Sequence, residues 1–400
     1  MSASGTLTPY TGASTFTITD EQRMLMDQAD RFGREQLFKH QEKMDNEEWW
    51  PPEMFRLLGD NGYLGATVPE EYGGAGLDTM SNSLIGQVLS RWNPAIAFSA
   101  GAHDALCVTN INRNASDEQK RKYLPKLCSG EWVGAMGMTE PGAGSDAIRG
   151  MQTTARRVGD KYILNGRKLY ITNGPIADVI LVYAKTEPKL GAMGISAFIV
   201  EKGFRGYSVA QKLIKMGYRG SPTGELLFDN CEVPVENLVG QENQGIAVMM
   251  SGLDIERAGI GCGLIGVCER ALQLSIEHAK TREQFGKPIA SFQMIQGKLA
   301  DMYTWLEAMR SYVYRGIAAC SNLEIGGGGR GEIHKLTAST ALFAGEMHNK
   351  ILNEAIQIHG GMGYMWESEI NRLYRTIKLL EIGAGTSEVR RIIIAEELLR

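Results

Sequence analysis

The sequence predicts a mainly α-helical protein with a central β domain, because the residue pattern changes character twice along its 400 residues. Apolar residues recur at helical spacing up to about residue 133 and again from 245 to the end. Between 134 and 244 the apolar segments are short, β-branched or aromatic, and separated by Gly, Asn, Asp or Pro. We therefore expect an N-terminal all-α domain over 18–133, a middle antiparallel β domain over 134–244 and a C-terminal four-helix-type bundle over 245–400.

The composition is that of an ordinary soluble globular protein, with 43% hydrophobic and 22% charged residues. This balance excludes disordered and collagen-like chains. The net charge of -4 offers no general attraction to nucleic acid or to an anionic membrane, so neither is expected as a partner. No run of about 18 apolar residues occurs, so no membrane span is predicted.

The cysteines and the N-terminal segment bear on the cellular compartment. The six cysteines form no CxxC pair and have no His partner at metal-ligand spacing, so we expect reduced core thiols and no metal site. No Lys or Arg precedes Arg23, and the first 17 residues are small and polar. We therefore expect no secretory signal or transit peptide, and a cytoplasmic location.

The N-terminal domain is expected to begin with a helix, because Thr19 and Gln22 form a capping-box pattern ahead of an amphipathic segment that reaches about Lys43. The Trp-Trp-Pro-Pro run at 49–52 should break this helix. Further helices are expected over Glu53–Asn61, Thr79–Trp92, Ile96–Asn110 and Asp117–Cys128, with a Gly-rich turn, VPEEYGGAGLD, over 68–78.

The middle domain contains five segments with strand character that are bounded by turn residues. They are Tyr162–Leu164, Leu169–Thr172, Val179–Ala184, Ile195–Val200 and Glu225–Phe228. The C-terminal domain is expected to be helical with breaks at 286–288, 326–329 and 360–363. The second break, in GGGGRGE, is most simply a connector between helices rather than a phosphate loop, because no strand precedes it.

One helical stretch, SGLDIERAGIGCGLIGVCER over 251–270, places a single acid, Glu256, in an otherwise small and apolar surface. Helix glycines cost roughly 1 kcal/mol each relative to Ala, which close packing or a ligand should offset. The plainer alternative is helix-on-helix packing with Glu256 paired to Arg257 or another neighbour. Residues at helical spacing should form a nearly flat stripe that a planar ligand can approach, namely Ile255, Gly259, Cys262 and Gly266.

Five further blocks place polar or aromatic groups at loops and element ends. MGMTEPGAGSD, over 136–146, leaves backbone N–H groups and the hydroxyls of Thr139 and Ser145 free to hold phosphates or the edge of a heterocycle. LYITNG, over 169–174, alternates an aromatic, a hydroxyl and an amide along a strand end. The others are TREQFGKPI with Phe292-Gln293, QIHGGMGY over 357–364 and EIGAGTSEVRR over 381–391.

These blocks, in this order and within an α/β/α layout, resemble the acyl-CoA dehydrogenase family of flavoproteins over essentially the whole chain from Asp20. The resemblance implies a middle antiparallel β-barrel, a C-terminal four-helix bundle, and a homotetramer in which FAD lies between the barrel and the bundle. It further implies an acyl-CoA substrate, and electron-transfer flavoprotein as the partner that accepts the electrons.

The resemblance also implies roles for individual positions. FAD would be bound by Met136, Met138, Thr139, Ser145, Tyr170, Ile171, Thr172, Arg282, Gln293, Gln357, Gly360, Gly361, Thr386, Ser387 and Glu388. Of these, Arg282, Gln293, Gln357 and Gly361 would reach the FAD of a neighbouring subunit. The acyl-CoA would contact Ser145, Ala247, Asp254, Arg257, Gly259, Gly383 and Gly385.

Physical arguments favour two of these positions independently. Arg282 is a delocalised cation suited to a diphosphate. Thr386 should open the last helix, where free N–H groups and the helix dipole favour an anion. The plainer interpretations are a salt bridge between Arg282 and Glu283, and a satisfied core amide for Gln357.

Two positions depart from the family pattern. Tyr170 stands where most members have Trp beside the flavin, and Ala384 stands where the commonest base, a Glu, precedes Gly-Thr. The isovaleryl-CoA dehydrogenase branch has a similar IGAGTSEVRR loop, a similar GAHxxLC segment, and its base within SGLDxER. The resemblance therefore makes Glu256 the base and the Ala384 N–H part of an oxyanion hole. Desolvation should raise the pKa of Glu256 and strengthen it as a base.

The expected function is FAD-dependent α,β-dehydrogenation of a branched or 3-substituted acyl-CoA. An acyl-CoA oxidase and a non-catalytic flavin-binding protein are the alternatives. Four positions have less volume here than in the isovaleryl branch, namely Ala247, Ala258, Gly259 and Leu380. This predicts a deeper pocket for a longer or aromatic group, as in citronellyl- or benzylsuccinyl-type thioesters. Repacking of Met249, Met250 and Trp366 into the space would instead leave isovaleryl-CoA as the substrate.

Overall fold

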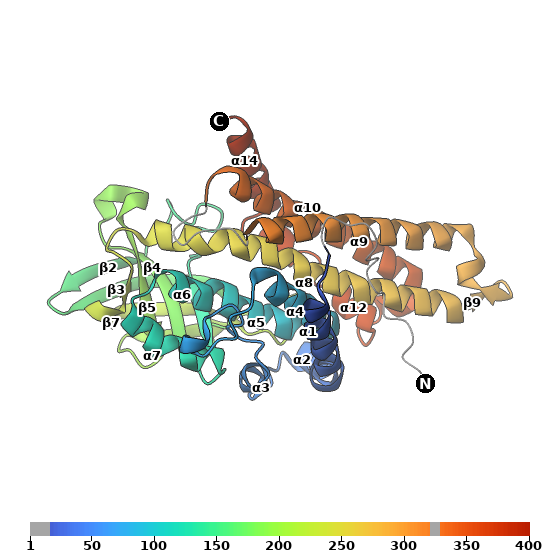
Figure 1. Ribbon diagram of the computed structural model, residues 1–400, viewed down its shortest axis with the longest axis horizontal. Helices are drawn as coiled ribbons and strands as arrows, with labels where there is room; N and C mark the ends of the chain where they lie inside the picture. The colour runs from blue at the N-terminus through green and yellow to red at the C-terminus, as the bar shows by residue number, and fades with distance from the viewer. Residues whose placement is uncertain (1–16, 321–328) are drawn as a thin grey trace.

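The sheet lies at one end of the molecule, with helices packed along it and three long helices extending away from it (Figure 1). The computed structural model describes residues 17–320 and 329–400. In Figure 1 the sheet lies at the left, the N-terminal helices lie along the lower face, and the long helices run to the right. This arrangement confirms the predicted mainly α fold with a central β domain.

The first helix begins as predicted, because Thr19 and Gln22 form a complete capping box ahead of α1 (Asp20–Phe32). The helical path continues through a π-type turn at Gly33–Leu37 and a 3₁₀ turn at Phe38–His40 into α2 (Gln41–Glu47). The others are α3 (Met54–Asp60), η3 (Glu70–Tyr72), α4 (Thr79–Trp92), α5 (Pro94–Ala102), η4 (His103–Val108), α6 (Thr109–Asn114) and α7 (Asp117–Cys128). The helix predicted over 96–110 is thus a run of three pieces with a π-type segment in its centre.

The middle domain forms one sheet with the strand order β6-β7-β3-β2-β4-β5-β8, and β1 pairs with β4 outside this path. Its strands are β1 (Gly134–Gly137), β2 (Thr154–Val158), β3 (Lys161–Thr172), β4 (Val179–Lys185), β5 (Ile195–Glu201), β6 (Tyr207–Lys212), β7 (Thr223–Pro234) and β8 (Leu238–Val239). Two short 3₁₀ helices, η5 (Pro188–Gly194) and η6 (Val235–Asn237), connect strands. All five predicted strand segments lie in β3, β4, β5 or β7.

The sequence suggested a purely antiparallel sheet, but the sheet also contains parallel strand pairs. β1 runs parallel to β4 over four residue pairs, and β2 meets β4 in a further parallel pair. The reason is that the long 138–153 segment separates β1 from β2, so β1 enters the sheet beside a strand that is not its sequence neighbour. The strand path ends at β6 and β8 without pairing them, so backbone hydrogen bonds do not close the described sheet into a ring.

The C-terminal domain is built on three long helices, α8 (Gly245–Thr281), α9 (Gln293–Cys320) and α10 (Gly331–His359). A hairpin of β9 (Glu283–Gln284) and β10 (Lys287–Pro288), followed by η7 (Ile289–Ser291), joins α8 to α9. Four short helices follow, α11 (Gly361–Tyr364), α12 (Glu369–Tyr374), α13 (Leu379–Ile382) and α14 (Ser387–Leu398). The predicted connector at 326–329 lies outside the described residues except for Gly329.

The glycines of α8 serve mainly helix packing, which corrects the prediction of a flat ligand stripe. A Cβ on Gly266 would lie 1.9 Å from the carbonyl oxygen of Gln87 on α4, so the two helices touch there. Cys262 is buried in the core of the bundle. Only Gly259 of the two stripe glycines borders open space, because a Cβ there would meet nothing within 4 Å. The stripe interpretation is therefore wrong for Cys262 and Gly266, which face protein.

Among the described helices, α8 alone is long and apolar enough, by length and composition, to cross a membrane. However, most of its apolar stretch is buried inside the fold. Its neighbours α4, α9 and α10 pack along it. We interpret α8 as the core helix of the bundle.

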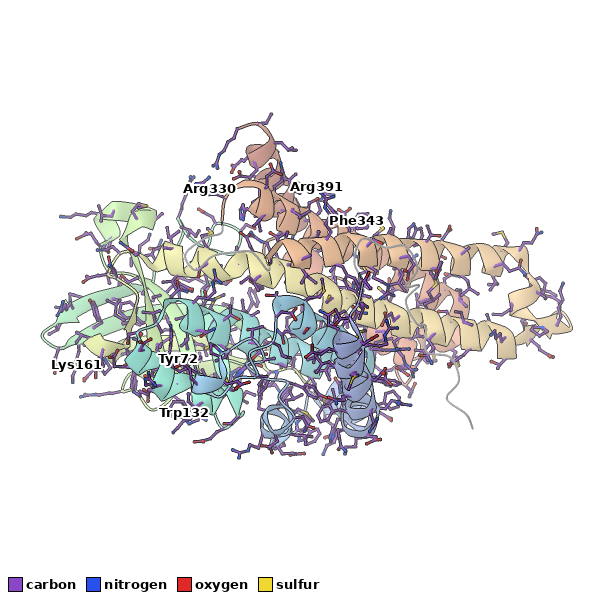
Figure 2. The ribbon with its side chains drawn as sticks, in the orientation of Figure 1. Tyr72, Trp132, Lys161, Arg330, Phe343 and Arg391 are labelled. Atoms are coloured by element: carbon purple, nitrogen blue, oxygen red, sulfur yellow. The ribbon has the colours of Figure 1, made fainter. Side chains whose placement is uncertain are left out.

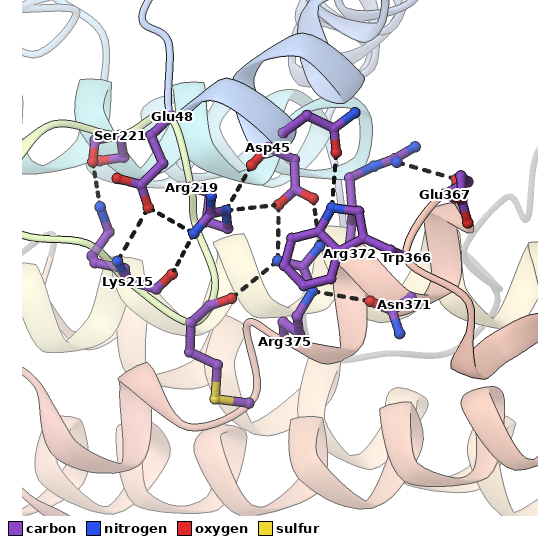
Figure 3. Close-up of polar contacts among 12 residues, drawn as sticks. Asp45, Glu48, Lys215, Arg219, Ser221, Trp366, Glu367, Asn371, Arg372 and Arg375 are labelled. Atoms are coloured by element: carbon purple, nitrogen blue, oxygen red, sulfur yellow. Dashed lines mark hydrogen bonds and ion pairs between the residues drawn. The ribbon is translucent and has the colours of Figure 1, made fainter.

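Charged residues join the N-terminal domain, the β6–β7 loop and α12 (Figure 3). The Arg375 guanidinium forms a two-pronged ion pair with Asp45, and Arg219 pairs with Glu48 at 2.9 Å. The indole N–H of Trp366 donates to Asn46 at 2.8 Å, and the Arg375 guanidinium lies 3.9 Å from its ring centroid. Trp366 is therefore held in this interdomain network, and the alternative in which it repacks into the substrate pocket is wrong.

His348 on α10 makes stability depend on pH. It is fully buried, Nδ1 has no hydrogen-bond partner among the described residues, and Nε2 lies 3.4 Å from the Thr376 hydroxyl. Burial lowers its pKa from 6.5 to about 3. The unfolded chain therefore binds a proton below pH 6.5 that the folded chain refuses, and stability falls as the pH decreases toward the folded pKa.

Substitution of His348 by Gln is expected to flatten the decrease in unfolding free energy between pH 7 and pH 5 by about 2 kcal/mol. Denaturant unfolding at both pH values measures this difference, and the other titrating groups cancel between the two proteins. Thr376→Val is the matched control, since it removes the Nε2 partner and keeps the histidine. Equal slopes for wild type and His348→Gln would contradict the assignment.

Candidate active site

The Glu256 side chain lies on α8, half-buried and without a hydrogen bond or ion pair to any residue in the described parts of the chain. Burial raises its pKa to about 7, against the opposing effects of Arg257 and Arg390. The alternative in which Glu256 pairs with Arg257 is wrong. Arg257 instead places Nη1 3.7 Å from Oδ1 of Asp254 and 3.5 Å from Nδ1 of His334.

Asp254 is fully buried, and its carboxylate is used inside the protein. Oδ1 lies 2.7 Å from Nδ1 of His334, and Oδ2 accepts from the Gly329 N–H at 2.8 Å. The Thr337 hydroxyl also donates to Oδ1, at 3.2 Å. The structure therefore gives Asp254 the task of holding the start of α10 against α8, and does not support its predicted contact with the substrate.

The loop between α13 and α14 reaches α8 beside Glu256. A Cβ on Gly385 would lie 3.9 Å from Nη2 of Arg257, which places the loop next to the Glu256-Arg257 pair. Ala384 adopts a left-handed backbone conformation with φ 55°, which is uncommon outside glycine. Its N–H donates to no described residue, so it is available to a ligand.

The N-terminus of α14 lies directly after this loop. Thr386 caps the helix as predicted, accepting from the Val389 N–H at 3.2 Å. The Ser387 hydroxyl is buried without a partner among the described residues, whereas Glu388 is exposed. The structure thus brings Thr386, Ser387 and Glu388 to the Glu256 side of the molecule.

The β domain contributes the loop after β1 and the end of β3. The Leu169 N–H donates to the Thr139 carbonyl at 2.8 Å, which ties the two segments together. Tyr170 has φ 62° at a register shift in the β3–β7 ladder, and its side chain is 66% exposed. Its ring is therefore presented outward, as a residue beside a planar cofactor would be.

Other predicted residues of the β domain differ in exposure. Ser145 is exposed, and Thr172 is half-buried. Met136 and Met138 are half-buried and pack against the core cluster that contains Val248 and Met249. The Ile171 side chain is buried in the core of the sheet, so a contact between this residue and the cofactor would have to come from its backbone.

A buried ion pair behind this surface escaped the sequence analysis. Lys168 is fully buried, and its Nζ donates to Oε1 of Glu140 at 2.9 Å and to the Met138 carbonyl at 3.1 Å. Glu140 also accepts from the backbone of Gln152 and Thr153. The pair fixes the 138–140 segment against β3. The signal in the sequence was a charged residue at an inward-facing position of a strand.

The positions expected near the acyl chain divide into two groups. Gly259, next to Glu256, faces open space, and Ala247 is exposed. Ala258 and Leu380 are buried in the core cluster of the bundle, at 1% and 5% exposure. Their smaller or altered side chains therefore affect core packing, and only Gly259 supports the predicted enlargement beside the base.

A second cluster lies at the far end of the bundle. Arg282 follows α8, Gln293 begins α9, and Gln357 lies in the last turn of α10 ahead of Gly360 and Gly361. The rings of His278 and His359 stack at 4.6 Å, which brings the ends of α8 and α10 together. From Glu256 to Arg282 the path along α8 is about 39 Å at 1.5 Å per residue.

The side chains of this distal cluster are free to bind. Arg282, Gln293 and Gln357 are exposed, and none of their side chains has a hydrogen bond or ion pair to a described residue. The interpretations of Arg282 as a salt bridge to Glu283 and of Gln357 as a core amide are therefore wrong. The resemblance implied one site for these residues, and they lie where α8 ends, α9 begins and α10 ends, at one end of the bundle.

Comparison with known proteins gives a match along nearly the whole chain. Family models match in order, namely the acyl-CoA dehydrogenase N-terminal domain over residues 19–131, the middle domain over 135–231 and the C-terminal domain over 243–399. The mitochondrial isovaleryl-CoA dehydrogenase of Oryza sativa subsp. japonica is 45% identical, covering 98% of this chain and 94% of the relative. The mitochondrial 2-methylacyl-CoA dehydrogenase of Solanum tuberosum is 43% identical, with coverages of 97% and 93%. The structure of butyryl-CoA dehydrogenase from Megasphaera elsdenii has a TM-score of 0.91 at 36% identity, covering 96% of this chain and 100% of that one.

Fold, site and matches together define an FAD-dependent oxidoreductase. Within that class, the chain belongs to the acyl-CoA dehydrogenase family, and the isovaleryl-CoA dehydrogenases are among its relatives. The residues present fit FAD. A free guanidinium at Arg282 suits the diphosphate, the outward ring of Tyr170 suits a flat heterocycle, and the Ser387 hydroxyl still lacks a partner among the described residues.

Proposed function

We propose that this enzyme removes the α- and β-hydrogens of a branched or 3-substituted acyl-CoA and forms the 2-enoyl-CoA. One observation carries the proposal. An unpaired, half-buried carboxylate, Glu256, lies beside a loop whose Ala384 N–H is free among the described residues. A base that is desolvated and a donor that is preorganised are the two groups that abstraction of a proton next to a carbonyl requires.

The residues of the chain divide the chemistry between them. Glu256 takes the α-proton, and its raised pKa makes the carboxylate a stronger base toward carbon. The Ala384 N–H donates to the thioester oxygen, where negative charge develops as the proton leaves. Bound FAD supplies the acceptor for the β-hydrogen, which leaves as hydride.

The distance between the two clusters supports an oligomer. The Ala384–Gly385 loop lies beside the Glu256-Arg257 pair, whereas Arg282 lies about 39 Å away along α8. One FAD cannot satisfy both ends of the same chain, so a second copy should bring its distal cluster to the first copy's cofactor. Large apolar side chains stand exposed at that end, among them Phe285 at 92%, Met294 at 79% and Tyr364 at 80%. We accordingly propose a homotetramer, with electron-transfer flavoprotein as the electron acceptor.

The substrate is proposed to carry a 3-substituent larger than that of isovaleryl-CoA, because Gly259 leaves open space beside the base. Specificity constants for isovaleryl-CoA and for bulkier 3-substituted thioesters test this directly. We expect kcat/KM to be about tenfold or more higher for the bulkier substrates than for isovaleryl-CoA. This is the difference expected when roughly two additional methylene groups are buried. A Gly259→Val variant should reverse the order, and a clear wild-type preference for isovaleryl-CoA would refute the larger pocket.

The reaction itself is tested by mixing the yellow protein anaerobically with the same thioesters. Bleaching of the flavin is expected, and its absence with every thioester would identify a non-catalytic flavin-binding protein. In a dehydrogenase, electron-transfer flavoprotein should re-oxidise the reduced flavin quickly and oxygen only slowly. In an acyl-CoA oxidase, oxygen should re-oxidise the flavin quickly.

A further inference from the structure

Arg390 on α14 is a fully buried arginine whose guanidinium is bonded only to backbone carbonyls among the described residues. Nη1 donates to Leu380 at 2.6 Å and to Ala341 at 3.3 Å, and Nη2 donates to Gly383 at 2.9 Å. Nε has no partner in the same part of the chain. Burial of a guanidinium without a bonded carboxylate is costly, and such a group persists where the surroundings require it.

Two of the three carbonyls belong to the turn immediately before Ala384. Leu380 lies in α13 and Gly383 follows it, so the guanidinium spans the turn. The third carbonyl, of Ala341, belongs to α10. Gly345 on α10 packs closely against this turn: a Cβ there would lie 3.2 Å from the Leu380 carbonyl oxygen, a tight contact, and 3.7 Å from Arg390 Nη1.

This bracing explains how Ala384 keeps its backbone conformation. A non-glycine residue at φ 55° is strained and persists only where its neighbours fix it. The hydrogen bonds from Arg390 end one residue before Ala384, at Gly383. Without them the turn would be free to relax toward an ordinary conformation, which would redirect the Ala384 N–H.

The charge of Arg390 also bears on the base. The charged groups that interact electrostatically with the Arg390 guanidinium are Arg257 and Glu256 from α8 and Glu381 from α13. Arg390 in turn lowers the pKa of Glu256. Tyr183 of β4 also interacts electrostatically with Glu256, because its pKa is raised by burial and, to a lesser extent, by Cys107 and Glu256. Glu381 is bound by Asn349 and Lys378, so Glu256 is the acid without a bonded partner in this group.

We propose that Arg390 is a positioning residue of the active site. It clamps the turn that aims the Ala384 N–H at the thioester oxygen. This inference rests on the proposed roles of Glu256 and Ala384. Arg391 provides a matched control, because it lies on the same helix with its side chain 53% exposed in an ion pair with Glu346 (Figure 2).

The clamp is tested without reference to activity. Hydrogen–deuterium exchange of the purified holoenzyme, read on peptides covering 379–386, compares wild type with Arg390→Gln, Arg390→Lys and Arg391→Gln. Both Arg390 variants should exchange about tenfold faster or more, as expected for loss of hydrogen bonds from a charged donor. Arg391→Gln should match wild type. Unchanged exchange in Arg390→Lys, the variant that keeps the buried charge, would overturn the clamp.

The charge effect is tested by the pH dependence of flavin reduction in single-turnover experiments. Arg390→Gln should move the midpoint upward, because a cation that favours ionised Glu256 is lost. Arg390→Lys should keep the midpoint and lower the maximal rate. Reduced rates with unmoved midpoints in both variants would make Arg390 merely structural and overturn the proposal. If no thioester reduces the flavin of the wild-type enzyme, the proposed function fails. The hydrogen–deuterium exchange experiment would still decide whether Arg390 clamps the turn.

Discussion

Glu256→Gln is expected to bind FAD and acyl-CoA normally and to lose flavin reduction by about 10⁴-fold or more, at or beyond the upper end of what one positioned base contributes. Gln preserves the shape of the side chain and removes its basicity. In wild type the reduction rate should rise with pH through about 7, because only the ionised carboxylate accepts the proton. Stopped-flow absorbance of the flavin measures both effects.

Glu381→Gln is the control for this experiment, since Glu381 lies one turn before Ala384 and its carboxylate is already bonded to Asn349 and Lys378. It should leave the rate within a few-fold of wild type. Ala384→Glu, combined with Glu256→Gln in a double variant, restores a carboxylate where other family members carry it and should recover part of the activity. A normal reduction rate in the single variant Glu256→Gln would exclude Glu256 as the base.

Arg282→Ala is expected to release most of the FAD while the bundle stays folded. A hydrogen bond from a charged donor contributes about 1.5–3 kcal/mol, which corresponds to roughly 10- to 150-fold weaker FAD binding. The Arg282 side chain is exposed and has no partner among residues 17–320 and 329–400, so the unfolding of the apoprotein should not change. Flavin absorbance after gel filtration gives the occupancy.

The same chromatogram tests whether the site is shared between copies. If the distal cluster completes a neighbour's FAD site, loss of flavin and loss of the tetramer should occur together. Lys280→Ala removes an exposed cation from the last turn of α8 and should retain both. Full flavin occupancy in a tetrameric Arg282→Ala would show that the assignment across the interface is wrong.

Local patterns in the sequence determined the helical and strand segments and the residues that carry the chemistry. The capping box at Thr19 and Gln22 and the helix over 79–92 formed where predicted, because both depend on residues within one or two turns. The resemblance of the motif blocks identified the family and FAD. It also singled out Glu256, which the described structure leaves unpaired, and the distal residues Arg282 and Gln357.

Tertiary structure alone decided which face of each element meets protein and which remains open. Gly259 and Gly266 have the same spacing signal, yet α4 covers Gly266 and nothing described covers Gly259. Asp254 and Glu256 are two residues apart, and only Asp254 meets His334, which lies near the start of α10. Arg390 became visible because a turn folds over its guanidinium. Such partners arrive from distant segments, and helical spacing fixes the direction of a side chain without specifying what it will meet.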